Sequence, residues 1–486
     1  MKFTFISPAA FRENLHERSE TVCSWPPLGM LYLATILEKE GFEVSLLDQA
    51  AKGLTIDETV KWINKENPDI VGFSTLASSG RTAAIIAGEV RKENPKAKIV
   101  FGNYYATFNA DRIMQKYPWI DMIVRSEGEI TTLELAKCLK NGESLKNISG
   151  LTFREKNRIV STPDQPLIKD VDSLPFPDRE MLDVEYHSEV AGAITAPEKF
   201  TTVLSSRGCP FRCRFCGCQR FARGVWRARS AENTVKELRF LTSLGYKQFL
   251  FVDDSFTVNP KRVIEICREM RKEKIDTDWV CEGRVDICSY DMMREMVKAG
   301  CKIIYFGIES ANQRILDYYN KRITPQQSET AVKTTRKAGM NAIVASFIVG
   351  APTETKEEIE NTLRFARKIP IDFPQFNILG VFPGMDIWDE LKTRGVLKEE
   401  EYWETGAWAS EMSPDCLPPE EVKQLIEKHF NAFLVRPKYL VTEAFRTVKS
   451  PYRINIVAHN LGRLGSIKGN VANVAKLRTR KKSYCT

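Results

Sequence analysis

The chain has 486 residues, of which 43% are hydrophobic, and a net charge of +8, which together predict two or three globular domains. Its longest apolar stretches, such as 342–351, are about half the length of a membrane span. Twelve cysteines are too few for a disulfide scaffold in so long a chain, and the N-terminus shows no signal segment. We therefore expect a cytoplasmic protein with reduced thiols.

Short apolar runs alternate with helical segments over residues 1–140. This alternation predicts an α/β domain with a doubly wound parallel sheet, which binds ligands at the carboxyl edge of its strands. The loops at that edge contain Ser74 and Leu76 after one strand and Gly102 and Asn103 after the next. The expected strands are 2–7, 43–48, 69–74, 98–101 and 121–124.

These loops carry a resemblance to a known domain. Ser74 and Leu76 match a Ser-x-Leu element, and Gly102 matches the first glycine of a Gly-Gly pair. The segment thus resembles the cobalamin-binding domain that is joined to many radical S-adenosylmethionine (SAM) enzymes. The resemblance implies that Ser74, Leu76 and Gly102 contact bound cobalamin.

The segment departs from that pattern at two places. The second glycine of the pair is Asn103, and the Asp-x-His-x-x-Gly motif that supplies the lower axial histidine is absent. An alignment on Gly29 places Ser24 and Pro26 where the Asp and the His would stand. The resemblance therefore implies cobalamin bound without an axial histidine. A vestigial or substrate-docking domain is the alternative.

Residues 141–196 are expected to form a linker, because Pro175 and Pro177 favour an extended path. Cys209, Cys213 and Cys216 follow soon after it, directly behind an apolar run. Thiolates with this spacing can hold three irons of a [4Fe-4S] cluster and leave the fourth iron free to bind a small molecule. Since Cys218 follows at once, a four-thiolate zinc site is the alternative.

With Arg207 and Gly208 before the first cysteine and Phe215 before the last, the segment resembles the radical SAM superfamily. In that superfamily the open iron chelates the amino and carboxylate groups of SAM. The resemblance assigns Cys209, Cys213 and Cys216 as cluster ligands and catalytic residues, and Phe215 as a residue beside the cofactor.

Residues 197–390 repeat a strand and a helix six times, which predicts a (β/α)6 partial TIM barrel. Functional groups gather at the carboxyl ends of the strands in such barrels. The expected strands are 201–205, 248–254, 278–286, 303–310, 341–350 and 375–382.

Residues at these strand ends are the expected SAM contacts, although capping of the following helix is an alternative role for each carboxylate. Arg229, where the cysteine loop enters its helix, can pair with the carboxylate of SAM or of a substrate. By resemblance, Asp253 and Asp254 lie near the SAM amino group, Glu309 and Ser310 near the ribose, and Gly350 near the adenine.

Residues 391–486 are expected to be mainly helical, and they are basic. From residue 436 onward, twelve Lys or Arg stand against the single acid Glu443. Such a tail is usually a solvated face or end, but apolar residues between the charges also permit a peripheral membrane contact. No nucleic-acid partner is expected.

Together these features predict a cobalamin-dependent radical SAM enzyme. Flavodoxin or ferredoxin would supply the electron that cleaves SAM, and an unactivated carbon of a small-molecule, lipid or tetrapyrrole substrate would be methylated or oxidatively cyclised. The domain order resembles the anaerobic magnesium-protoporphyrin monomethyl ester cyclases and the hopanoid- and lipid-modifying subgroups. The alternatives are a radical SAM enzyme with a vestigial cobalamin domain, catalysing carbon–carbon coupling or methylthiolation, and a non-enzyme that senses cobalamin or holds a structural cluster.

Overall fold

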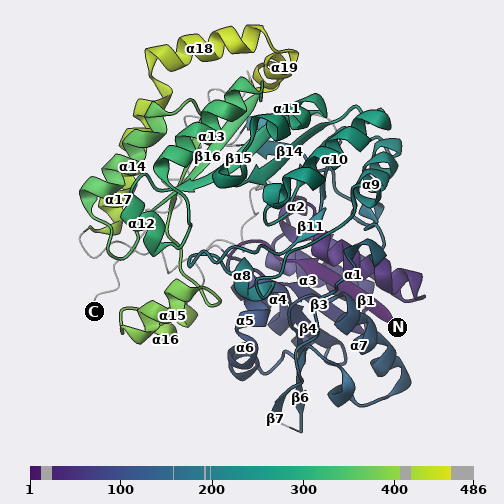
Figure 1. The fold of residues 1–486 in the computed structure, drawn as a ribbon. Coiled ribbons are helices and arrows are strands. Elements are labelled where there is room, and N and C mark those ends of the chain that lie inside the picture. Colours follow the sequence, from purple (N-terminus) through teal and green to yellow (C-terminus); the bar gives the residue numbers. More distant parts are fainter. Residues whose placement is uncertain (12–24, 157, 191–192, 197–198, 406–416, 461–486) are drawn as a thin grey trace.

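Two sheets, one mostly parallel and one wholly parallel, make up most of the molecule together with the helices that cover them (Figure 1). The computed structural model describes residues 1–11, 25–156, 158–190, 193–196, 199–405 and 417–460. The expected α/β fold class, with a helical C-terminal region, is confirmed.

The N-terminal sheet has the strand order β2-β1-β3-β4-β5-β6-β7. Its first five strands are parallel and start or end within one residue of their expected bounds. The strands are β1 (Lys2–Ser7), β2 (Glu43–Asp48), β3 (Ile70–Ser74), β4 (Lys98–Gly102), β5 (Met122–Val124), β6 (Leu151–Glu155) and β7 (Arg158–Ser161). The helices are α1 (Leu28–Lys39), α2 (Gln49–Lys52), α3 (Ile56–Glu66), α4 (Gly80–Glu93), α5 (Asn103–Phe108), α6 (Ala110–Lys116) and α7 (Glu129–Asn141).

Strands β6 and β7 form an antiparallel hairpin on the edge of this sheet. The hairpin lies inside residues 141–196, which were expected to be a linker. The chain reverses between Glu155 and Arg158, and the sequence has no Asn-Gly or Asp-Gly pair there to mark the turn. We propose that the N-terminal domain extends to Ser161. A second short hairpin, β8 (Ser188–Val190) and β9 (Ala193–Ala196), precedes the second sheet.

The second sheet is an open, wholly parallel sheet with the order β10-β13-β14-β15-β16-β17. Each expected strand is present, and strand alternates with helix around the sheet. The strands are β10 (Phe200–Val203), β13 (Gln248–Phe251), β14 (Asp278–Gly283), β15 (Cys301–Glu309), β16 (Ala342–Val349) and β17 (Phe373–Ile378). The helices are α9 (Ala231–Ser243), α10 (Pro260–Lys272), α11 (Tyr290–Lys298), α12 (Gln313–Tyr318), α13 (Pro325–Lys337) and α14 (Lys356–Lys368).

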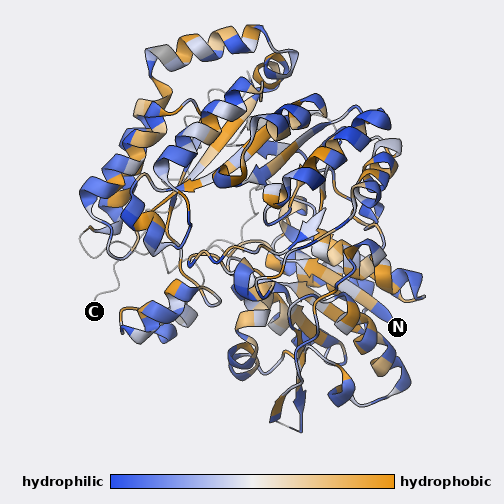
Figure 2. Ribbon diagram, in the orientation of Figure 1, coloured by the Kyte–Doolittle hydropathy of each residue, from blue (hydrophilic) through white to orange (hydrophobic). Residues whose placement is uncertain are grey.

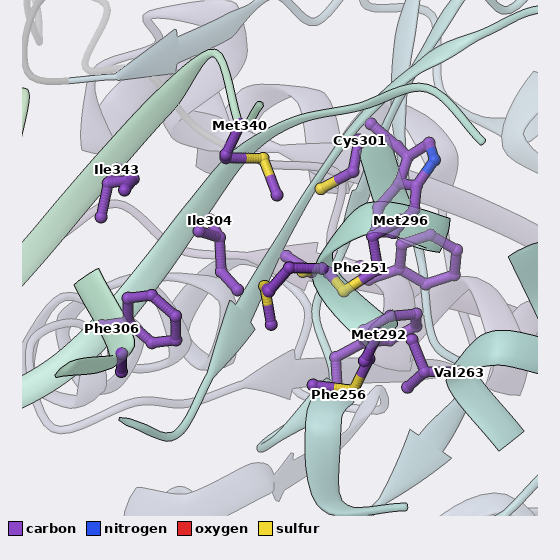
Figure 3. Close-up of a cluster of buried hydrophobic side chains, with 14 of the residues drawn as sticks. Phe251, Phe256, Val263, Met292, Met296, Cys301, Ile304, Phe306, Met340 and Ile343 are labelled. Atoms are coloured by element: carbon purple, nitrogen blue, oxygen red, sulfur yellow. The ribbon is translucent and has the colours of Figure 1, made fainter. Parts of the chain in front are cut away.

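Apolar packing holds the strands to the helices outside them. Figure 3 shows Phe251 and Phe256 beside Val263 of α10 and Met292 and Met296 of α11, all fully buried. In Figure 2 the strands of this sheet are largely hydrophobic, whereas the surrounding helices alternate between the two colours. This pattern fits amphipathic helices that cover a buried parallel sheet.

In the described part of the chain, five further helices follow β17. Trp388 and Trp403, on the first two of them, are buried in the same apolar cluster as Tyr105 of the N-terminal domain, so these helices join the two sheets. No helix among the described residues is long and apolar enough to cross a membrane. The helices are α15 (Asp386–Thr393), α16 (Glu399–Thr405), α17 (Pro419–Leu434), α18 (Pro437–Val448) and α19 (Pro451–Asn460).

Candidate active site between the two sheets

The three cysteines lie on a loop that starts with a short strand, β11 (Ser206–Arg207), paired with β12 (Arg227–Ala228). Gly208 follows with a φ of +79°, and a Cβ atom there would lie 2.2 Å from the carbonyl oxygen of Val225. Only glycine fits this position. The glycine therefore sets the path of the chain into Cys209.

The Cys209, Cys213 and Cys216 thiols are free and lie close enough to interact electrostatically. Burial raises the pKa of Cys209 to about 11 and also raises that of Cys213. A hydrogen bond from Cys218, the first residue of α8 (Cys218–Phe221), lowers the pKa of Cys216. Cys218 thus stabilises the thiolate form of Cys216.

Among the described residues, no three Cys, His, Asp or Glu side chains converge as the ligands of a single metal ion would. A [4Fe-4S] cluster makes a different demand, because each thiolate binds a separate iron atom. Three free thiols on one loop, at the carboxyl end of the sheet, fit that cluster.

Asp253 is hydrogen-bonded to the residues that lead into the cysteine loop. Its carboxylate accepts from the backbone N–H of Ser205 at 2.8 Å, from the Ser205 hydroxyl at 2.7 Å, and from the hydroxyl of Ser206. Burial raises the pKa of Asp253, and the charge of Arg262 partly opposes this. Both oxygens are used inside the protein, so Asp253 positions the loop, and its proximity to the SAM amino group stays a prediction.

The side chain of Asp254, unlike that of Asp253, lines the cavity between the two sheets, as contact with bound SAM requires. One of its oxygens accepts from the backbone N–H of Gly208 at 2.8 Å. Contact between Asp254 and SAM stays a prediction.

Two buried cations lie beside Cys213, and the sequence analysis assigned neither. Arg284 Nη1 is 3.9 Å from the Cys213 sulfur. Lys321 donates to Glu309 at 2.7 Å, and its charge lowers the pKa of Cys213 against the larger effect of burial. Glu309 itself has a φ of +64°, a conformation that costs a non-glycine residue energy and that this ion pair helps to hold.

The remaining predicted SAM contacts are engaged within the protein. The Ser310 hydroxyl is hydrogen-bonded to Thr362 at 3.1 Å, and Phe215 packs edge-on against Tyr319. Gly350, with a φ of +89°, donates its N–H to Glu354 at 2.7 Å. Their contacts with SAM remain predictions.

Arg229 does not reach the cysteine loop with a free guanidinium. It is buried, forms an ion pair with Glu237, and donates to the side chain of Asn233 at 2.7 Å and to the carbonyl of Leu204 at 3.2 Å. These bonds hold the guanidinium within the protein, and pairing of Arg229 with an acid of SAM or of a substrate stays a prediction. The next residue, Ser230, caps the following helix and accepts from the N–H of Asn233 at 3.0 Å.

A cavity of about 350 Å³ lies between the N-terminal sheet and the cysteine loop, within the usual size range of ligand sites. Ser74 and Gly102 line it from one side, and Gly208, Phe221 and Asp254 line it from the other. Leu76 is not among its lining residues and is about half exposed. The structure therefore brings two of the three predicted cobalamin contacts to the cavity.

Asn103 keeps the backbone conformation that a glycine would favour. Its φ is +75°, which asparagine tolerates better than other non-glycine residues, and its amide donates to the Ser74 hydroxyl at 3.0 Å. The next residue, Tyr104, stacks on Phe221 with ring centroids 4.0 Å apart. Burial raises the pKa of Tyr104, which keeps this phenol protonated. The substitution of the second glycine thus leaves the loop geometry intact.

Histidine is missing from the described part of the cavity wall. Pro26 is described, whereas Ser24 and His16 lie outside the described residues. The cavity has glycines at 29, 72, 102 and 128 along its wall, where a large flat ligand can approach the backbone. A Cβ atom on Gly72 would lie 2.6 Å from the Phe5 ring, so that wall has no spare room. These features fit cobalamin held without an imidazole ligand.

A buried charge network joins the two sides of the cavity, and the sequence analysis did not foresee it. Arg227 donates to both oxygens of Glu127 at 2.9 Å, and Arg207 lies 3.4 Å from Glu127 and 2.6 Å from Glu129. Burial alone would raise the pKa of Glu127, but the two arginines lower it below its usual value. The cysteine loop is thereby fixed to the N-terminal domain.

Comparison with known proteins agrees with this architecture. Residues 203–366 match the Radical SAM superfamily, and residues 20–136 match the B12 binding domain. An uncharacterized methyltransferase of Pyrococcus horikoshii is 37% identical over 421 residues, which cover 86% of this chain and 90% of the relative. The anaerobic magnesium-protoporphyrin IX monomethyl ester cyclase of Cereibacter sphaeroides is 30% identical over 403 residues, 81% of this chain and 64% of the cyclase.

A solved structure has the same fold. The radical SAM methyltransferase TsrM of Kitasatospora setae, with cobalamin and a [4Fe-4S] cluster bound, superposes with a TM-score of 0.65 at 17% identity, covering 81% of this chain and 75% of TsrM. The fold and the cysteine loop thus define a radical SAM enzyme. More narrowly, the chain belongs to the cobalamin-binding family of methyltransferases and cyclases within that superfamily. The expected cofactors, a [4Fe-4S] cluster, SAM and cobalamin, are confirmed by the two matched domains.

Proposed function

We propose that this enzyme modifies an unactivated carbon atom of a small-molecule, lipid or tetrapyrrole substrate, by methyl transfer or by oxidative cyclisation. One observation carries the proposal: the same cavity is lined by Gly102 of the B12 binding domain and by Gly208 and Asp254 beside the cysteine loop. A cofactor in that cavity contacts both domains, as a reaction that uses cobalamin and SAM on one substrate requires.

When bound, the reduced cluster supplies the electron that cleaves SAM to methionine and a 5′-deoxyadenosyl radical, and cobalamin supplies a methyl group. The chain's own residues hold and surround these groups. Cys209, Cys213 and Cys216 provide three thiolates, so one iron is left for SAM. Arg284 and Lys321 place positive charge beside Cys213 and favour its thiolate form.

The surroundings of the loop also shield part of it from water. Cys213 is buried, and the stacked rings of Tyr104 and Phe221 lie over the loop between the two domains. Exclusion of water protects a reactive radical from side reactions. The hydrogen bonds of Asp253 and the buried charge network fix the position of the loop relative to the cavity. The reacting groups are therefore positioned before the substrate binds.

The relatives support two outcomes, since one is named a methyltransferase and another a cyclase. We propose flavodoxin or ferredoxin as the electron donor and the reducing cytoplasm as the location, because a partly exposed cluster needs a reducing compartment. No nucleic-acid partner is proposed.

The test is anaerobic SAM cleavage. The protein is reconstituted with iron, sulfide and hydroxocobalamin, reduced, and assayed for 5′-deoxyadenosine and methionine. Wild type should release both, and Cys213→Ala should release neither. Cys288→Ala is the matched control, because the Cys288 thiol packs near Thr335, away from the loop.

Methyl transfer and cyclisation are separated by SAM with a labelled methyl group, since only methyl transfer moves the label into an acceptor. Cleavage without bound cobalt would favour the alternative with a vestigial cobalamin domain, in which carbon–carbon coupling or methylthiolation replaces cobalamin chemistry. Absence of cleavage in a fully reconstituted protein would instead support a cobalamin-sensing or structural iron–sulfur protein.

A further inference from the structure

The polar side of helix α18 packs against the rest of the protein. Arg446 donates to Asp372 at 2.8 Å and to the carbonyl of Asn341 at 2.9 Å. Tyr439, on the same side of the helix, donates its hydroxyl to the carbonyl of Asp372 at 2.7 Å, and Glu443 pairs with Arg446. The helix is therefore anchored by charges and hydrogen bonds.

The apolar side of α18 faces outward. Val441 is 71% exposed, Phe445 60% and Val448 77%, and these residues share one face because they recur every three or four positions. Helix α19 packs against α18 and also has exposed apolar residues, Ile454 and Val457. We call the exposed apolar residues of the two helices the α18–α19 face, and its members are Leu440, Val441, Phe445, Val448, Ile454 and Val457.

This orientation is the reverse of that in an ordinary amphipathic helix, which buries its apolar stripe against the core. Single exposed apolar residues are common on protein surfaces, but a contiguous set marks a surface that meets something else. In Figure 1, α18 and α19 lie along the edge of the molecule opposite the N-terminal sheet, where such a surface is accessible.

The charges around the α18–α19 face indicate the kind of surface that it binds. Lys449 is exposed and lies over the Phe445 ring, 4.1 Å from its centroid. No acidic residue follows Glu443 in the sequence, and residues 461–486, which continue from the end of α19, contain seven Lys or Arg. Pairing of this face with a second copy would bring like charges together, whereas an anionic surface complements them.

We propose that the α18–α19 face docks on the surface of an anionic lipid bilayer. Helices that combine an apolar stripe of Phe, Leu and Val with neighbouring Lys and Arg bind in the plane of the headgroups. The apolar side chains would enter the boundary between headgroups and acyl chains, and Lys449 would reach the lipid phosphates. This inference does not depend on the reaction proposed above.

Vesicle co-sedimentation of the full-length protein tests the proposal. The vesicles contain phosphatidylglycerol mixed with phosphatidylcholine, or phosphatidylcholine alone. The V441S/F445S double variant removes apolar area without a change of charge and should lower the partition coefficient at least about tenfold. Phe240→Ser is the matched control, since Phe240 is 47% exposed on α9 and lies outside the face.

Binding to the anionic vesicles that weakens with added salt and is lost in V441S/F445S, but not in Phe240→Ser, would support the proposal. Three outcomes would overturn it: no binding by the wild type, equal binding by the double variant, or equal binding to phosphatidylcholine alone. A concentration-dependent dimer that the double variant dissolves, without vesicle binding, would assign the face to a second copy of this chain. Circular dichroism confirms that the variants are folded.

Discussion

Removal of Glu127 should destabilise the protein far more than removal of an ordinary surface carboxylate. Its side chain is 9% exposed and accepts two hydrogen bonds from Arg227, which is itself 8% exposed. In Glu127→Ala, Arg227 would keep only its bond to the carbonyl of Ile168, at 2.8 Å. Breaking one side of a buried ion pair costs about 3–5 kcal/mol, because the remaining charge is buried without compensation.

A double-mutant cycle separates the pair from its surroundings. Arg227→Met should also be costly, because it leaves Glu127 with only the more distant Arg207 and the N–H of Ile168. The E127A/R227M double variant should lose less than the sum of the two singles, by about 2 kcal/mol, because neither charge is then left unpaired.

The assay is urea-induced unfolding at neutral pH, followed by fluorescence and by circular dichroism, with Glu89→Ala as the control. Glu89 pairs with Lys92 on an exposed helix surface, and loss of that pair should cost less than about 1 kcal/mol. If Glu127→Ala costs no more than Glu89→Ala, or if the cycle is additive, the network does not fix the cysteine loop to the N-terminal domain.

Three further predictions concern the cluster, the cavity and a buried acid. Cys213→Ala should bind less than half the iron of wild type after reconstitution, measured by metal analysis, and full iron would refute its role as a ligand. Gly72→Val should weaken cobalamin binding at least about tenfold in equilibrium dialysis, because its side chain would collide with Phe5; unchanged affinity would place cobalamin elsewhere. Burial raises the pKa of Glu354 to about 7, so its stabilising protonated form is complete below pH 4.5 and is lost as pH rises through 7. Between pH 5 and 8 the free energy of unfolding of wild type should therefore fall by about 2 kcal/mol relative to Glu354→Gln, and parallel profiles would refute the buried acid.

Most of the fold could be predicted because hydrophobic periodicity is a local signal. Each expected strand of both sheets is present, and helix ends follow local cues such as Ser230 at the start of α9 and Gly245 after it. The hairpin of β6 and β7 was missed because the sequence between its strands lacks the Asn-Gly or Asp-Gly pair that marks tight hairpins.

The sequence predicted mainly those site residues that lie at the ends of strands. Asp253 and Asp254 are neighbours in sequence, yet one holds the cysteine loop and the other faces the cavity, because successive residues leave a strand in opposite directions. Lys321 had no local signal, since it reaches Cys213 only through the fold. Arg207 stood in a segment already singled out and Glu127 follows the last strand expected in the N-terminal domain, but their pairing depends on contact between two domains.

The most direct test of the account is whether cobalamin binds in the cavity without an axial imidazole. The reconstituted protein is loaded with hydroxocobalamin, freed of excess cofactor by gel filtration, reduced, and measured for cobalt content and by electron paramagnetic resonance. The account predicts about one cobalt per chain, a spectrum that is unchanged when the protein is labelled with 15N, and loss of cobalt in Gly72→Val. Absence of retained cobalt, or a nitrogen splitting that changes with 15N labelling of the protein, would contradict it.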